Sequence, residues 1–129
     1  MMGVITAVHT LIYADDPDAA RAFFRDVLQL PGVDTGGGWL IFKSGPSELA
    51  VHPRSWEHEG RTGSTSQQFD LSLMCDDLAE TMAQLTAKGA EFSGEVTDQG
   101  WGLTVRLTVP GAGEMILYQP KYDPPATSL

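Results

Sequence analysis

The hydrophobic and polar positions of the chain follow the same order twice. Residues 8–16 form a strand-like apolar run that ends in two aspartates, and residues 69–77 form a matching run 61 positions later. Each run is followed by apolar residues at helical spacing, and then by three short apolar segments separated by turns. A repeat of this kind predicts two tandem copies of one β-α-β-β-β unit, and hence an α+β fold.

The two predicted helices begin directly after the paired aspartates. Asp16 precedes Pro17, and this order is typical of a helix N-terminus. Asp77 is its equivalent in the second unit, where the helix is expected to end at Lys88-Gly89. The first helix has an apolar stripe that needs a sheet face to cover it. The stripe consists of Ala20, Phe23, Phe24, Val27 and Leu28.

The remaining apolar segments predict three strands after each helix. In the first unit they lie near Val33 and at residues 39–42 and 48–52, and in the second at residues 91–96, 103–109 and 114–119. The polar segment between the units predicts a linker, and the residues from Asp123 onward are expected to fray. A single domain therefore spans residues 1–129. It divides into a first module at about 4–53, a linker at about 54–67, a second module at about 68–120 and a tail at 121–129.

Alternation assigns the strand residues to faces, because neighbours along a strand point to opposite sides of the sheet. Leu71, Leu73 and Cys75 are assigned to the face under the helix. The opposite faces should line one cleft, mostly apolar with a few polar groups, as small-molecule pockets commonly are. The residues that we expect to bind a ligand there are His9, Leu11, Tyr13, Trp39, Ile41, Leu49, Val51, Asp70, Ser72, Trp101, Thr104, Arg106, Thr108, Ile116 and Tyr118.

Some of these residues have a structural alternative. A strand histidine is often a hydrogen-bonded core residue, so His9 has two candidate roles. Asp70 is equally well explained as a cross-strand partner of Arg106. Trp39 and Trp101 lie beside glycine-containing turns, where a ring either closes over a flat ligand or packs in the core. The sequence leaves these alternatives open.

The charge balance is acidic, with 8 Lys and Arg against 17 Asp and Glu and a net charge of −9. Nucleic acids and anionic membranes attract basic surfaces, so neither is expected as a partner. The apolar runs are shorter than the roughly 20 residues of a membrane span, and the start of the chain lacks a signal-peptide pattern. The single Cys75 cannot form an intrachain disulfide, which suits a reducing compartment. We therefore expect a cytoplasmic protein that binds a small molecule.

Three segments resemble a known superfamily. They are residues 9–16 (HTLIYADD), residues 22–30 (AFFRDVLQL) and residues 110–120 (PGAGEMILYQP). In sequence and order they are similar to the vicinal oxygen chelate superfamily, which includes glyoxalase I, extradiol dioxygenases and bleomycin resistance proteins. The resemblance implies that the two modules form a half-open mixed β-barrel around a cleft, and that the chain forms a homodimer.

The resemblance also implies where a metal would bind. In the metal-dependent members, ligands lie on the first and last strands of each module, and the matching positions here are His9, Leu49, Asp70 and Ile116. Aliphatic side chains cannot ligate a metal, and a stable site needs three or four donors. Glu48 is expected on the opposite face from Leu49. The fallback metal set is therefore His9, Asp70 and Glu114.

Two functions remain after these observations. The first is a metal-free binding protein that sequesters a hydrophobic or aromatic compound, such as an antibiotic, with no cofactor. The second is a lyase, isomerase or dioxygenase of the same superfamily, with a divalent metal in a rearranged site. A metal-free version of this enzyme would use His9 as a general base and Arg106 to stabilise an oxyanion.

Overall fold

The computed structural model describes residues 3–27, 30–45, 47–109 and 113–128. Leu28 of the predicted stripe and residues 110–112, the start of the third resembling segment, lie outside the described residues, as do the side chains of Phe23 and Val27. The first module and the segment after it contain β1 (Ile5–Ala14), α1 (Pro17–Ala22), the π-helix η1 (Phe23–Val27), β2 (Gly32–Asp34), β3 (Leu40–Lys43), β4 (Ser47–Pro53), β5 (Ser55–His58) and β6 (Arg61–Ser64). The rest of the chain forms β7 (Phe69–Cys75), α2 (Leu78–Ala87), β8 (Phe92–Asp98), β9 (Gly102–Val109), β10 (Gly113–Pro120) and α3 (Pro125–Ser128).

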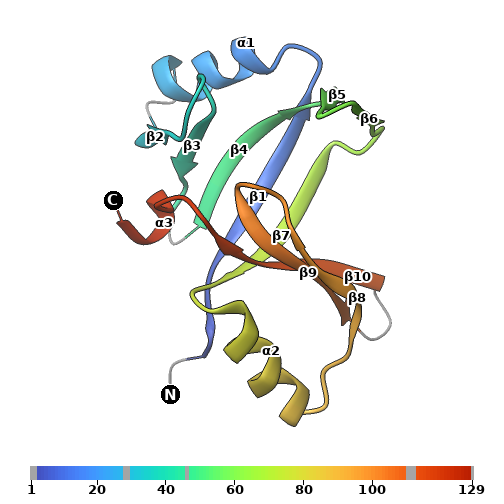
Figure 1. Cartoon of the computed structure of the whole chain (residues 1–129). Coiled ribbons are helices and arrows are strands. Elements are labelled where there is room, and N and C mark those ends of the chain that lie inside the picture. Colours follow the sequence, from blue (N-terminus) through green and yellow to red (C-terminus); the bar gives the residue numbers. More distant parts are fainter. Residues whose placement is uncertain (1–2, 28–29, 46, 110–112, 129) are drawn as a thin grey trace.

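Eight strands form one mixed sheet in the order β2-β3-β4-β1-β7-β10-β9-β8 (Figure 1). Within each module the first strand pairs in parallel with the last, β1 with β4 and β7 with β10. The modules join through the antiparallel pair β1 and β7. The sheet does not close, since β2 and β8 are its two edges. The predicted pair of β-α-β-β-β units in a half-open barrel is confirmed.

The helices begin where the aspartates predict. Asp16 Oδ1 accepts a hydrogen bond of 3.0 Å from the backbone N–H of Ala19, and Asp77 Oδ1 accepts one of 3.0 Å from Glu80. Each aspartate thus satisfies one of the first N–H groups of its helix, which have no partner inside the helix. Helix α2 ends at Ala87, with Lys88 as its C-cap before Gly89, which has a φ of 98°. None of the helices in the described part of the chain is long and apolar enough to cross a membrane.

Helices α1 and α2 lie on the same face of the sheet. Under α2, the side chains of Leu78, Cys75, Val105 and Leu117 form a buried core cluster. Next to α1, the ring of Phe24 packs against Phe42 of β3, with 5.9 Å between ring centroids. The predicted assignment of Cys75 to the helix-covered face is confirmed, and burial raises the pKa of its thiol. We call the opposite face of the sheet the inner face.

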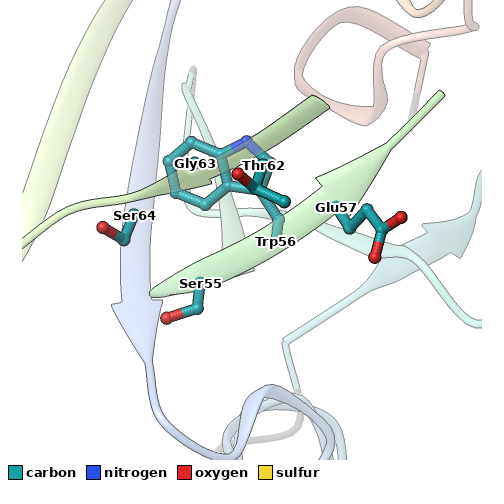
Figure 2. A pocket seen from close by; sticks show the side chains of 6 residues that line it. All are labelled: Ser55, Trp56, Glu57, Thr62, Gly63 and Ser64. Carbon is teal, nitrogen blue, oxygen red and sulfur yellow. The ribbon is translucent and has the colours of Figure 1, made fainter. Parts of the chain in front are cut away.

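The predicted linker contains a β-hairpin, β5 and β6, which the sequence analysis missed. Its two-residue turn has positive φ at both positions, 51° at Glu59 and 77° at Gly60, and this favours the tight turn of an antiparallel pair. Trp56 pairs with Gly63 across the hairpin. The hairpin forms a shallow hollow of about 560 Å³, lined by Ser55, Trp56, Glu57, Thr62, Gly63 and Ser64 (Figure 2).

Replacing Gly63 by alanine tests the packing of the hairpin. A Cβ atom at this position would lie 2.5 Å from two carbons of the Trp56 indole, so the ring has to move. We expect Gly63→Ala to destabilise the protein by about 1 kcal/mol and to shift the emission of Trp56. Urea unfolding followed by tryptophan fluorescence measures both effects. Gly3→Ala is the matched control, because the space around that position is open.

The tail does not fray as predicted. After β10 the chain turns back, and α3 lies against β3, β1 and β4 (Figure 1). Pro125 is fully buried, and Tyr122 and Ala126 pack against Ala7 and Met74 of the sheet. So short a helix carries no periodic pattern in the sequence, and its contacts with the inner face stabilise it.

Candidate functional site

The strand register aligns polar groups in one row across the inner face. His9 of β1 pairs with Glu48 of β4 on one side and with Ser72 of β7 on the other. The row continues through Ile116 of β10 to Arg106 of β9. Paired residues share a face of the sheet, so all five side chains are on the inner face. The predicted facing of His9, Ser72, Arg106 and Ile116 is therefore confirmed.

The predicted facing of Leu49 and Val51 is wrong. Leu49 pairs with Thr10 and with Phe42, and Val51 pairs with Ile12, so both belong to the face that α1 covers. The strand alternates, but its apolar residues point under the helix, where they are removed from water. Glu48 consequently points to the inner face, the reverse of the expectation. An alternation that is shifted by one residue assigns every side chain of the strand to the wrong face of the sheet.

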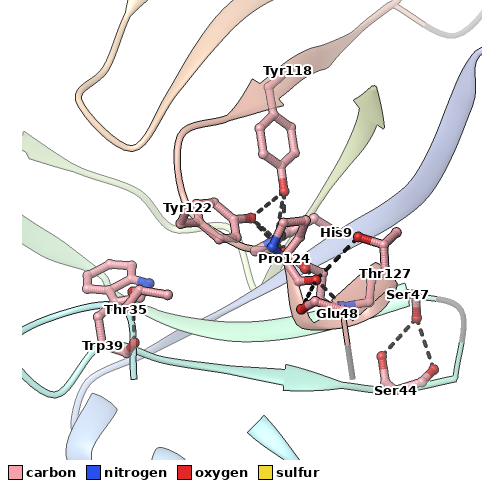
Figure 3. A network of polar contacts seen from close by, with 12 residues as sticks. His9, Thr35, Trp39, Ser44, Ser47, Glu48, Tyr118, Tyr122, Pro124 and Thr127 are labelled. Carbon is pink, nitrogen blue, oxygen red and sulfur yellow. Dashed lines mark hydrogen bonds and ion pairs between the residues drawn. The ribbon is translucent and has the colours of Figure 1, made fainter. Parts of the chain in front are cut away.

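A buried polar cluster surrounds Glu48 (Figure 3). Its carboxylate is fully buried, and Oε2 lies 2.5 Å from His9 Nδ1 and 2.6 Å from the hydroxyl of Tyr122. The hydroxyl of Tyr118 lies 3.0 Å from His9 Nδ1 and 2.7 Å from the hydroxyl of Tyr122. The backbone N–H of Ala126 points to Oε1 at 3.4 Å. These donors offset much of the cost of burying the carboxylate.

The tyrosines of the cluster stay protonated over the physiological range. Burial is the main cause that raises the pKa of Tyr118 and of Tyr122 above the ordinary value of 10.0, and the nearby Glu48 carboxylate raises both further. Burial, followed by the Asp70 carboxylate, also raises the pKa of Tyr13. All three hydroxyls can therefore act as hydrogen-bond donors at neutral pH.

These shifts predict how stability depends on alkaline pH. A group whose pKa is raised by folding contributes stability that is complete below its unfolded pKa of about 10 and is lost as the pH rises above it. Absorbance at 295 nm should show at most one of the three tyrosines, Tyr13, ionising while the protein is folded. Ionisation of Tyr118 and Tyr122 should coincide with loss of the circular dichroism signal at higher pH. Ionisation of two or three tyrosines near pH 10 with the fold intact would contradict the buried cluster, and the protein unfolded in urea gives the reference titration.

Aromatic rings gather beyond this cluster, at the end of β1 nearest the hairpin. The ring of His52 lies 5.5 Å from Tyr13, 5.3 Å from Trp39 and 4.9 Å from Trp56, each in an edge-to-face arrangement. Tyr13 pairs with His52 in the register, and so both face inward. The guanidinium of Arg21 lies 4.8 Å from the Trp39 ring, which fixes one side of the indole. We call Tyr13, Trp39, His52 and Trp56 the aromatic group.

A hollow of about 210 Å³ lies on the second module, lined by Asp70, Arg106, Glu114, Met115 and Ile116. Asp70 accepts a hydrogen bond from the hydroxyl of Tyr13 at 3.5 Å, which links the hollow to the aromatic group. In the described part of the chain Arg106 forms its ion pair with Glu114, at 3.9 Å, rather than with Asp70. Glu114 also accepts a hydrogen bond from Ser93. The hollow therefore combines an aliphatic wall with charges of both signs.

The family model of the glyoxalase/bleomycin resistance protein/dioxygenase superfamily matches residues 6–111. The chain belongs to this superfamily. The match covers most of both modules, and so it supports the resemblance of the sequence to the vicinal oxygen chelate proteins. No curated protein matches the chain.

Solved structures share the fold at low identity. Methylmalonyl-CoA epimerase from Mycobacterium tuberculosis is 15% identical with a TM-score of 0.60, and the match covers 93% of this chain and 91% of that one. A Legionella pneumophila structure described as an NAD-dependent benzaldehyde dehydrogenase is 16% identical with a TM-score of 0.60, covering 88% and 99%. A superfamily member from Vibrio splendidus 12B01 is 12% identical with a TM-score of 0.50, covering 87% and 97%. At these identities the likeness shows the fold alone.

The inner face does not fit the metal site of metal-dependent superfamily members. Among the described residues there is no group of three or more His, Cys, Asp and Glu side chains placed to hold a metal ion. Glu48, rather than Leu49, lies beside His9, but Asp70 bonds to Tyr13, and Glu114 bonds to Ser93 and Arg106. The fallback set of His9, Asp70 and Glu114 is therefore not brought together.

The other predicted residues divide between the two ends of the inner face. Leu11 pairs with Asp70 and with Ala50, and Ile41 pairs with Ala50, so both face inward in the row of paired residues that contains Asp70. Thr104 and Thr108 face inward opposite Tyr118 and Glu114. Trp101 is half exposed at the far end, where its ring lies 5.3 Å from that of Tyr118.

Four residues of the site were missed: Glu48, His52, Trp56 and Tyr122. Glu48 and His52 alternate with Leu49 and Val51, and a rule that sends the apolar residues under the helix would have placed both on the inner face. The residue pair Glu59-Gly60 was the available signal for the hairpin that positions Trp56. We find no sequence signal for the return of Tyr122.

Proposed function

We propose that the protein binds a small planar aromatic compound without a metal, on the part of the inner face that α3 leaves uncovered. One observation supports this most directly: the aromatic group lies beside the hollow, and the Tyr13–Asp70 hydrogen bond connects them. Sequestration of such a compound, for example an antibiotic, is the biological role that we propose. The homodimer and the cytoplasmic location expected from the sequence stay predictions.

The arrangement favours a cationic or neutral ligand. A flat ring can stack or pack edge-to-face on Tyr13 and His52, and each aromatic contact is worth about 0.5–1.5 kcal/mol beyond burial. Asp70 pairs with no cation among the described ion pairs, so its carboxylate is available to a positively charged group of the ligand. The net charge of −9 adds long-range attraction for cations.

Fluorescence titration tests the proposal with three probes of similar size and different charge. Proflavine is cationic, 2-naphthol is neutral and 2-naphthoate is anionic. We expect saturable quenching of the tryptophan emission to give the lowest dissociation constant for proflavine and the highest for 2-naphthoate. Trp39→Ala should weaken proflavine binding about tenfold, whereas Trp101→Ala, at the far end of the inner face, should leave it unchanged. No saturable quenching by any probe would overturn the proposal, with circular dichroism used to confirm that each variant folds.

A second candidate function rests on the pair His9 and Glu48. With Nδ1 donating to the carboxylate, Nε2 of a neutral His9 is left as the basic nitrogen, as in a general base oriented by a carboxylate. Arg106 lies three strands away from His9, about 14 Å along the sheet, so the two do not meet at one oxyanion.

Proton exchange measures this alternative directly. Methylmalonyl-CoA, the compound in the name of the Mycobacterium epimerase, has an acidic C–H group that a base of this kind would exchange with D₂O. Exchange seen by proton NMR, and abolished by His9→Gln, would favour the enzyme over the binding protein.

A further inference from the structure

The tail places two donors on a single carboxylate of the inner face. The phenol of Tyr122 donates to Glu48 Oε2 at 2.6 Å, and the N–H of Ala126 points to Oε1 at 3.4 Å. Figure 3 shows the hydroxyls of Tyr122 and Tyr118 meeting beside His9 and Glu48. Beneath them Glu48 is fully buried and His9 is nearly so. A carboxylate is thus built into the sheet, and the donors opposite it belong to a separate segment.

Apart from these bonds, the segment is held by side-chain packing, with Pro125 buried and with Tyr122 and Ala126 against the inner face. α3 has four residues, and its bonds from Thr127 and Ser128 return only to Pro124. The hydrogen bonds that the structure gives from residues 122–128 to the strands all end on Glu48, Tyr118 or His9. The preceding Lys121 is fixed separately, by its ion pair with Asp98 and its backbone bond to Trp101. Displacing residues 122–128 would therefore break none of the backbone hydrogen bonds that the structure gives for β10, although it would expose Pro125 and the packed ring of Tyr122.

We infer that Glu48 forms a second ligand subsite, for a phenol that bears an adjacent N–H donor, and that residues 122–128 fill it as an internal competitor. Such a ligand would replace the Tyr122 hydroxyl on Oε2 and the Ala126 N–H on Oε1, and pack its ring on Met74 and Tyr118. Hydrogen bonds to a buried carboxylate are stronger than neutral ones. The subsite is distinct from the aromatic group. The inference about Glu48 can therefore be wrong while the proposed function is right, and the proposed function can be wrong while the inference is right.

The test uses the full chain with 2-acetamidophenol, whose hydroxyl and N–H are adjacent. Tyr122→Phe removes the competing hydroxyl, and Ala126→Pro removes the competing N–H, which points to Glu48. We expect each variant to bind the probe several-fold more tightly than the natural chain, and the double variant about tenfold more tightly, because the competitor is weakened. Thr127→Ala, an exposed position bonded only within the tail, should change nothing.

Two further measurements decide the outcome. In the double variant, Glu48→Gln should weaken binding at least tenfold, and 2-methoxyacetanilide, which lacks the phenol hydroxyl, should not bind. In the natural chain, saturating probe should move the backbone amide signal of Ala126 toward its unfolded position in an NMR spectrum. Equal binding of the methoxy compound, or no gain in affinity from the tail variants that circular dichroism shows to be folded, would overturn the inference. Neither result depends on proflavine binding, which tests the proposed function.

Discussion

Replacing Glu48 by alanine should lower the free energy of unfolding by about 3 kcal/mol, a large loss for the removal of one polar side chain. The substitution removes the acceptor of His9 and Tyr122 and leaves both donors in a buried site. It also removes the acceptor of the Ala126 N–H, one of the contacts that hold α3 against the sheet. Urea unfolding followed by circular dichroism measures the loss.

Two comparisons identify the cause. Glu48→Gln keeps the volume and one acceptor oxygen, so it should cost less than the alanine variant. Glu57→Ala removes an exposed carboxylate from the hairpin and should change stability by less than about 0.5 kcal/mol. If Glu48→Ala is as stable as Glu57→Ala, the carboxylate is not in the buried cluster, and the register between β1 and β4 is wrong.

Leu78→Ala should destabilise the protein by about 3 kcal/mol, because it opens a cavity under the first turn of α2. Leu78 is 1% exposed and belongs to the core cluster with Cys75, Val105 and Leu117. The helix has only ten residues, so its stability depends on this packing rather than on its own propensity. Urea unfolding midpoints at constant m-value measure the effect.

Leu71→Ala is the matched control for the core. Leu71 lies on the same face of the sheet but is 48% exposed, so its truncation should cost less than about 1 kcal/mol. Leu78→Met, which nearly conserves volume, should also cost less than about 1.5 kcal/mol. Equal losses from Leu78→Ala and Leu71→Ala would show that α2 does not pack as described.

The sequence predicts the fold well because the two halves repeat one pattern of strand, capped helix and strands. Asp16 and Asp77 each combine a cap with the end of an apolar run, and both mark a helix start in the structure. The face of the sheet to which each strand residue points is harder to predict. For the segment at 48–52, two opposite assignments satisfy the same alternation, and only the helix that covers the strand decides between them. The apolar Leu49 and Val51 point under α1, and this leaves Glu48 beside His9.

The rest of the site depends on contacts between distant segments. Tyr122 reaches Glu48 across 74 positions of the chain, and nothing local to the tail indicates that contact. His52 and Trp56 meet because the hairpin folds over the end of β4, and a polar composition hides the hairpin from a hydrophobicity pattern. Long-range contacts of this kind are set by tertiary packing, and local sequence preferences do not determine them.

The most direct test of the proposed binding site is an NMR titration of the indole N–H signals. The chain has three tryptophans, which give three such signals when they are labelled with ¹⁵N and assigned from single Trp→Phe variants. As proflavine is added, we predict saturable shifts for Trp39 and Trp56, the two tryptophans of the aromatic group, with Trp101 unchanged. Shifts confined to Trp101, or no saturable shift at any of the three, would contradict a ligand site at the aromatic end of the inner face.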